Sequence, residues 1–166
     1  MNRQTEAARR QALANFGEDR ALQLLQRKGF AVEKMPKNFP FFDLMAKKGS
    51  RRLLVPVKTR SKFTDQGKIK KSDYNLYTKN GHLDSVEKIA NFFGAEIRWV
   101  AVTVDTRAKS FSTYTGDVRT LRSRNECRYI PMHPDRDVPR HKGLVIDQSD
   151  DAILESWSNV VGTVGR

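Results

Sequence analysis

The segment from Ile97 to Val104 carries the strongest strand pattern in the chain. Its sequence, Ile-Arg-Trp-Val-Ala-Val-Thr-Val, is rich in β-branched and aromatic residues, which favour extended backbone. Successive side chains of a strand point to opposite faces, and here apolar residues occupy both faces. Strands of this kind are buried on both sides, so we expect a sheet that other elements cover on each face.

The segment immediately before this strand predicts a helix. Between His82 and Phe93 apolar residues recur at helical spacing, and Gly94 follows as a stop. An earlier apolar run, Leu53 to Val57, predicts a strand over residues 52–59. A strand, a helix and a second strand in this order imply a crossover, so we expect the two strands to run parallel.

The first part of the chain predicts a long helix and two further strands. The helix is expected over residues 5–28, ends at Gly29, and has an apolar face made of Leu13, Phe16, Ala21, Leu24 and Leu25. Strands are expected over residues 30–35 and 41–46, with a proline-containing turn between them. Three short strands joined by tight turns suggest an antiparallel meander that the helix covers on one face.

These elements predict an α/β fold with a mixed sheet flanked by helices, in the order α-β-β-β-α-β. A chain of 166 residues suits one domain with a complete core. We therefore expect a single domain over residues 1–166, with a core at about 5–105 and an extension at about 106–166. The extension is expected to add strands at Lys109–Thr115 and Cys127–Pro131, and a short helix near Ile153–Val160.

Residues suited to chemistry gather around the end of the third predicted strand, which closes with Lys58, Thr59 and Arg60. Leu54, Pro56 and Lys58 share one face of this strand. Asp43 is embedded in the second strand, so it is expected to approach Lys58 on the neighbouring strand. Glu18 lies on the flank of the apolar face of the first helix. It is either a solvated boundary residue or a carboxylate that points towards a metal, and Gly17 beside it would let the helix approach the sheet closely.

This order of residues resembles the PD-(D/E)XK nuclease superfamily, which includes restriction endonucleases, Holliday-junction resolvases and some homing endonucleases. The resemblance rests on Glu18, Asp43 and the run Val57-Lys58-Thr59-Arg60, and it covers roughly residues 13–105. It is closest to the subgroup whose third strand reads (E/Q)-V-K-T-R, as in intron-associated and resolvase-like members. The resemblance implies a restriction-endonuclease-like fold and metal-dependent cleavage of DNA phosphodiesters.

The resemblance also implies a role for each matching residue. Asp43 and the Val57 backbone carbonyl would be metal ligands, Lys58 the base on the water side, and Glu18 an auxiliary acid that also reaches the metal. The implied ion is Mg²⁺ or Mn²⁺, since such ions take hard oxygen ligands. At one position the chain departs from the family, because Pro56 stands where the family carries Glu or Gln.

The departure at Pro56 has two consequences. Magnesium sites usually rest on one or two carboxylates plus substrate oxygens, so we expect weak metal binding, if any, with Glu18 as the residue that compensates. Proline also removes a hydrogen-bond donor from an interior strand, which indicates either a bulge at this point or a different placement of the strand.

The charge of the chain indicates an anionic partner. The formal net charge is +12 and the sequence pI is about 10.1, which favours a nucleic acid. Charge does not distinguish DNA from RNA, and it is the resemblance that implies DNA. Basic residues are densest between Lys47 and Lys71, where we expect phosphate contacts with a steep salt dependence; a solvated lysine-rich loop is the alternative. The nucleic-acid-binding candidates are Arg51, Arg52, Arg60, Lys62, Lys68, Lys70, Lys71 and Tyr74, of which Tyr74 either stacks on a base or covers the edge of the core.

Composition limits the remaining classes. The single cysteine, Cys127, excludes an intramolecular disulfide and fits a reducing cytoplasm, and the scattered histidines disfavour a structural zinc site. No stretch approaches the roughly 18 apolar residues of a membrane span, so we expect a soluble cytoplasmic protein without a membrane partner.

Three hypotheses about function follow. The first is a divergent metal-dependent endonuclease acting on DNA, for which a homodimer is a further prediction because many relatives dimerise to cut both strands. The second is a catalytically inactive relative that binds nucleic acid or serves as a scaffold. The third is a basic interaction protein with a different α/β fold, in which Asp43 and Lys58 would lie far apart.

Overall fold

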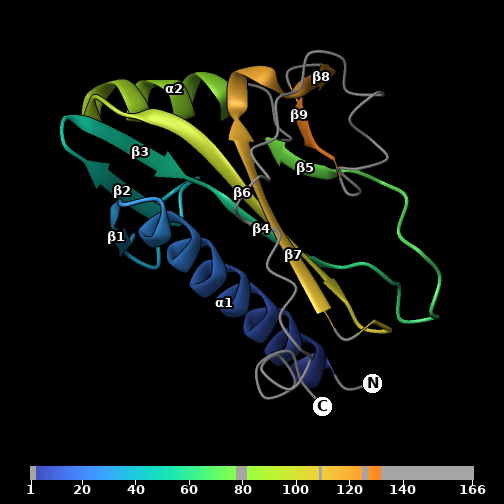
Figure 1. Cartoon of the computed structure of the whole chain (residues 1–166). Coiled ribbons are helices and arrows are strands. Elements are labelled where there is room, and N and C mark those ends of the chain that lie inside the picture. Colours follow the sequence, from blue (N-terminus) through green and yellow to red (C-terminus); the bar gives the residue numbers. More distant parts are fainter. Residues whose placement is uncertain (1–2, 78–81, 109, 125–126, 132–166) are drawn as a thin grey trace.

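The structure, a computed structural model, describes residues 3–77, 82–108, 110–124 and 127–131 and is organised around a six-stranded sheet (Figure 1). The strands of this sheet are β1 (Ala31–Lys34), β2 (Leu44–Lys48), β3 (Arg51–Val55), β4 (Val57–Ser61), β6 (Glu96–Asp105) and β7 (Ser110–Asp117). Helix α1 (Arg3–Arg27) crosses one face. Helix α2 (His82–Phe93) and a small sheet of β5 (Tyr74–Tyr77), β8 (Arg122–Arg124) and β9 (Cys127–Ile130) lie on the other. A 3-10 helix, η1 (Val118–Thr120), follows β7.

The topology of the main sheet is the one that the sequence predicts. Strands β1, β2 and β3 form an antiparallel meander, and β6 then lies parallel to both β3 and β4. Strand β7 pairs antiparallel with β6 along its whole length, from Ser110 opposite Asp105 to Asp117 opposite Arg98. The mixed sheet and the α-β-β-β-α-β order are therefore confirmed. Of the strands after residue 105, β7 belongs to this sheet, whereas β8 and β9 pair with each other and with β5 in the small sheet.

Two apolar layers hold the sheet between its covering elements. On one face the predicted apolar stripe of α1 is buried against β2, β3 and β6, with Ala21, Leu24 and Leu25 in contact with strand residues such as Leu53 and Val100. Gly29, with φ of 87°, lets the chain leave the helix and return as β1. Burial of such large apolar side chains is the main force that fixes α1 on this face.

The opposite face carries a larger and more aromatic core. Trp99 and Tyr114 pack edge to face at a centroid distance of 5.8 Å, and α2 adds Val86 and Ala90. The buried hydroxyl of Tyr114 donates to the carbonyl of Pro131 at 2.6 Å, which ties the chain after β9 to this layer. The expectation that β6 is buried on both faces is confirmed by these two cores.

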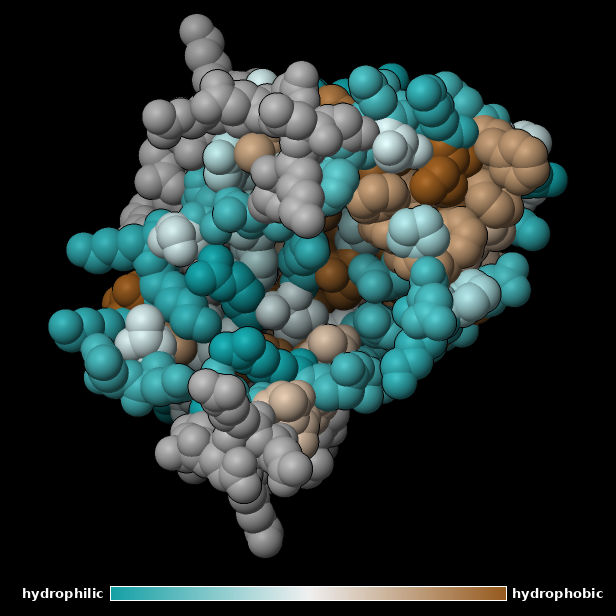
Figure 2. Space-filling view, turned by 180° about the vertical axis from the view of Figure 1, so that it is seen from behind, coloured by the Kyte–Doolittle hydropathy of each residue, from teal (hydrophilic) through white to brown (hydrophobic). Residues whose placement is uncertain are grey.

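An apolar surface remains over α2 (Figure 2). Phe92 is 84% exposed, and its ring lies 5.4 Å from that of Phe93, which in turn contacts Phe39 at 6.1 Å. In Figure 2 the brown side chains gather in the upper right, on the side of α2, while most of the remaining face is hydrophilic.

Some predicted boundaries differ from the structure. Strand β2 begins at Leu44 rather than at residue 41, because Phe41 adopts a φ of 68° and the chain turns there. The strands expected at Lys109–Thr115 and Cys127–Pro131 are present as β7 and β9. The helix expected near Ile153–Val160 lies outside the described residues. Within the described part of the chain, no helix is both long and apolar enough to cross a membrane.

Candidate active site

Asp43 is held at the point where three strand ends meet. Its amide donates to the carbonyl of Val55 at 3.0 Å, and its own carbonyl accepts from the amide of Met35 at 2.9 Å. The Asp43 backbone therefore lies between the end of β1 and the end of β3. Its carboxylate Oδ2 accepts the amide of Val57 at 2.7 Å, which orients the side chain towards the start of β4.

Pro56 separates β3 from β4 without a change of register. Leu54 lies opposite Ile97 and Val57 lies opposite Val100, so the offset between partners is the same on both sides of the proline. The Pro56 carbonyl accepts the amide of Val100 at 3.0 Å, and only the donor that proline lacks is missing from the ladder. The sequence predicts that Pro56 causes either a β-bulge or a different placement of this strand. The pairing with β6 shows neither, because the register is continuous across Pro56.

The break at Pro56 coincides with the end of the neighbouring strand. Strand β2 begins at Leu44, opposite Val55 at the end of β3, and does not extend alongside β4. Among the described strands β4 therefore has β6 alone as a neighbour. The Val57 amide points to the open side, where it meets Asp43. The N–H and C=O of one residue in a strand point the same way, so the Val57 carbonyl faces the Asp43 side as well.

Side chains alternate along β3 and β4 as the sequence predicts. Leu53 and Val55 belong to the core beneath α1, and Leu54 belongs to the opposite core. Thr59 continues the α1 side, because a Cβ placed on Gly17 of α1 would lie 1.6 Å from Thr59 Oγ1. The glycine is therefore what allows α1 to approach β4, as expected from the sequence.

The predicted catalytic residues line one pocket of about 290 Å³ at this open edge. Its lining consists of Arg10, Leu13, Ala14, Glu18, Asp43, Val57, Lys58 and Thr59. A helix, a loop and a strand thus bring together all four residues to which the resemblance assigns a role: Glu18, Asp43, Val57 and Lys58. The hypothesis of a different fold with Asp43 and Lys58 far apart is wrong.

The two carboxylates of this pocket influence each other. Burial raises the pKa of Asp43, while the Val57 amide and the Lys58 ammonium act to lower it. Burial and then the Asp43 carboxylate raise the pKa of Glu18, against the opposing effect of Lys34. Both carboxyl groups therefore have raised pKa values, and a cation bound between them would stabilise their charged forms and lower these pKa values.

The donor set of this pocket fits a weakly held Mg²⁺ or Mn²⁺ ion. In the described residues no group of three or more His, Cys, Asp or Glu side chains is arranged to hold an ion. Asp43, Glu18 and the Val57 carbonyl offer hard oxygens for part of a shell, which suits an ion that keeps several waters and takes the rest from substrate phosphate. Pro56 adds no donor.

The predicted nucleic-acid-binding residues fall into two groups at opposite ends of the strand pair. Arg51 and Arg52 begin β3, where Arg51 Nε lies 2.9 Å from Glu96 Oε2 and Arg52 donates to the carbonyl of Phe93 at 3.3 Å. Arg60, Lys62, Lys68, Lys70 and Lys71 lie in β4 and the loop after it. The two ends are roughly 30 Å apart at the usual rise of an extended strand, and Lys58 lies close to the second group.

The second group converges on helix α1. Burial, followed by the nearby Arg60 guanidinium and Arg9 of α1, lowers the pKa of Lys70, against the opposing effect of the Asp65 carboxylate. Arg9 also pairs with Asp65 at 3.3 Å, and Lys62 pairs with Asp105 at 3.0 Å. Arg9 of α1, Arg60 of β4 and Lys70 of the following loop therefore lie near one another.

The structure corrects the prediction that Tyr74 could stack on a nucleic-acid base. It is 3% exposed, its hydroxyl donates to the carbonyl of Val102 at 3.2 Å, and the Arg60 guanidinium lies over its ring at 5.1 Å. Burial raises the pKa of Tyr74 to about 12. A ring covered in this way cannot stack on a base, so Tyr74 covers the edge of the core, and the predicted stacking role is wrong.

Comparison with known proteins gives one kind of match. No protein-family model matches the chain, and no curated protein matches it in sequence. Nineteen solved chains match in structure. One is Hjc, a Holliday junction resolvase from the archaeal hyperthermophile Archaeoglobus fulgidus, with 22% identity, a TM-score of 0.45, and coverage of 67% of this chain and 84% of that chain.

The chain has an α/β fold with a mixed main sheet. The order of its elements and the mixed sheet with helices on both faces are those that the resemblance to PD-(D/E)XK nucleases implied.

The sequence prediction missed one residue that lines this pocket, Arg10, and one buried residue whose hydroxyl is affected by the Asp43 charge, Tyr77. Arg10 lines the pocket with Glu18 and Asp43, and its spacing was the available signal, because Arg10, Ala14 and Glu18 recur every four residues on one side of α1. Tyr77 is 2% exposed and its hydroxyl has no hydrogen-bond partner among the described residues. Burial and the Asp43 charge raise the pKa of Tyr77, and no local pattern marks this residue.

Proposed function

We propose that this protein is a divergent metal-dependent endonuclease that hydrolyses DNA phosphodiesters in the pocket between α1 and β4. The observation that carries the proposal is the convergence of Glu18, Asp43, Val57 and Lys58 on one pocket. An acid pair that can hold a cation, with a lysine beside it to act on the attacking water, is a combination suited to phosphodiester hydrolysis.

Each residue of the pocket has a distinct role in this proposal. Asp43, already oriented by the Val57 amide at 2.7 Å, would hold Mg²⁺ or Mn²⁺ together with Glu18 and the Val57 carbonyl. The ion, when bound, would stabilise negative charge on the phosphate and make a bound water more acidic. Lys58 would orient or deprotonate the attacking water. The positive surface of Arg60, Lys62, Lys68, Lys70 and Lys71 would bind flanking phosphates.

A second candidate function is DNA binding without cleavage. Pro56 favours it, because proline offers no ligand at the position that the family uses to hold the metal. In this alternative Asp43 is a structural acceptor for the Val57 amide, and the positive surface alone accounts for binding. Homodimerisation stays a prediction under either function, and light scattering on the full chain would measure it.

Nicking of supercoiled plasmid with Mg²⁺ or Mn²⁺ tests the first proposal. The informative variants are Asp43→Asn, which keeps an acceptor for the Val57 amide, and Lys58→Ala; Lys88→Ala, an exposed lysine of α2, is the matched control. We expect both site variants to lose at least about a hundredfold in rate, and the control to keep the wild-type rate. Salt-sensitive DNA retention without nicking would support the second candidate, and absence of both binding and nicking would overturn both.

Replacement of Pro56 separates the two functions further. Pro56→Glu places a carboxylate on the Lys58 face of the strand, whereas Pro56→Ala restores only the backbone amide. If Asp43 and Glu18 form a metal site, Pro56→Glu should bind Mn²⁺ at least about tenfold more tightly than Pro56→Ala in calorimetric titration. Equal affinities would mean that the pocket holds no metal.

A further inference from the structure

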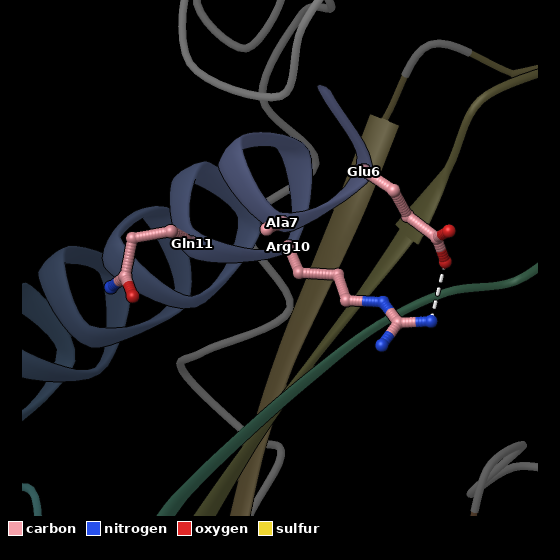
Figure 3. Close-up of a pocket in the computed structure, with 4 residues that line it drawn as sticks. All are labelled: Glu6, Ala7, Arg10 and Gln11. Atoms are coloured by element: carbon pink, nitrogen blue, oxygen red, sulfur yellow. Dashed lines mark hydrogen bonds and ion pairs between the residues drawn. The ribbon is translucent and has the colours of Figure 1, made fainter. Parts of the chain in front are cut away.

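Arg10 lies between two adjoining hollows on the surface of α1. It lines the pocket that contains Glu18, Asp43 and Lys58, and it also lines a neighbouring pocket of about 460 Å³ with Glu6, Ala7 and Gln11 (Figure 3). Figure 3 shows its side chain extending away from the helix to meet the carboxylate of Glu6. Arg10 thus places a positive charge beside the pocket that holds Glu18 and Asp43, and the proposed function assigns it no role.

The partner of Arg10 in the free protein is easily exchanged. Arg10 and Glu6 form an ion pair one helical turn apart, and their side chains are 78% and 44% exposed. Exposed pairs of this spacing contribute little, because water competes for both partners and the side chains lose freedom when they pair. A phosphate that offers two oxygens to the guanidinium fork would therefore displace Glu6 readily.

We propose that Arg10 clamps a backbone phosphate of the bound nucleic acid, next to the phosphate that lies at Asp43, and that Glu6 holds Arg10 until the nucleic acid arrives. The proposal rests on the proposed function for the identity of the ligand. Eight residues of helix separate Arg10 from Glu18, a rise of about 12 Å, so Arg10 reaches a flanking phosphate rather than the one between the two acids. The strand would then run from the positive surface, across the pocket and along the first half of α1.

The chain offers a matched control for this arginine. Arg27 belongs to the same helix, is exposed, and lies in the last turn, 17 residues or about 25 Å further along the axis. Arg27→Ala therefore removes the same charge from the same element without touching the pocket. Arg10→Lys keeps the charge and removes the fork, and Glu6→Gln removes the competing carboxylate.

The test is binding of a short fluorescein-labelled DNA duplex, without divalent ions, at a series of KCl concentrations. Arg10→Ala should lower the slope of log affinity against log salt by about 0.7–0.9, the value for one lost phosphate contact, and weaken binding about tenfold. Arg27→Ala should change the slope by less than half as much. Arg10→Lys should keep the slope with weaker binding, and Glu6→Gln should bind more tightly than wild type.

The outcomes separate this proposal from the endonuclease proposal. Equal effects of Arg10→Ala and Arg27→Ala on slope and affinity would overturn the clamp, even if the wild-type protein nicks plasmid. An Arg10-specific loss of slope in a protein that does not nick would support the clamp and reject the endonuclease. Circular dichroism of each variant excludes unfolding as the cause, and both arginines are exposed, so folded variants are expected.

Discussion

Replacing Gly17 by alanine should loosen the contact between α1 and β4 on which the candidate site depends. A Cβ at this position would lie 1.6 Å from Thr59 Oγ1, 2.7 Å from Thr59 Cβ and 3.0 Å from Thr59 Cγ2. Rotation of the threonine can move Oγ1, but it leaves the Cβ where the strand puts it. The helix, the strand or both must therefore shift to admit one methyl group.

Two effects of opposite sign set the size of the change. Glycine to alanine inside a helix stabilises by roughly 1 kcal/mol through backbone entropy. Forcing a methyl group into a packed contact costs about 1–3 kcal/mol, and the short distance to a Cβ places this case at the upper end. We expect a net loss of about 1–2 kcal/mol in the free energy of unfolding, which corresponds to a drop in Tm of about 2–8 °C for a domain of this size.

Urea unfolding of Gly17→Ala and Thr59→Gly, alone and combined, measures the contact. The double variant removes every threonine atom that the new methyl group meets, so a double-mutant cycle should show a favourable coupling of at least about 1 kcal/mol. Gln23→Ala, at an exposed position of α1, is the control for helix propensity and should change stability little. If Gly17→Ala alone proves more stable than wild type by about 1 kcal/mol, the close approach of α1 to β4 is refuted.

Two further predictions concern the acid pair and its surroundings. Because burial raises the pKa of Asp43 above its ordinary value of 3.8, wild-type stability should fall as pH rises from there through the raised folded value. Asp43→Asn should therefore be more stable than wild type at neutral pH and equal to it in acid; urea unfolding across pH measures this, and a less stable variant at neutral pH would contradict it. Tyr77→Phe removes a buried hydroxyl that has no partner among the described residues, so it should raise the free energy of unfolding by about 1 kcal/mol. A loss of that size in the same assay would mean that the hydroxyl is hydrogen-bonded after all.

The sequence was sufficient for most of the fold because helix and strand periodicities are local. The apolar stripe of α1 and the double-sided apolar pattern of β6 each specify a layer, and the crossover rule makes β3 and β6 parallel. The start of β2 was misplaced because Phe41 takes a positive φ, which the apolar pattern does not reveal. For the site, the residues that the family resemblance assigns share one pocket, although their catalytic roles remain predictions.

What the sequence by itself determined is the set of elements, their order, and the presence of Lys58 and Arg60 in β4. Only the tertiary structure decided that β2 begins opposite Val55 and does not extend alongside β4, so that Asp43 and the Val57 backbone meet at an open edge. It also decided that Tyr74 is buried and that Arg10 shares a pocket with Glu18. The physical reason is that periodicity is set by neighbouring residues, whereas burial and pocket lining depend on segments that are distant in the chain and are brought together by the packing of the core.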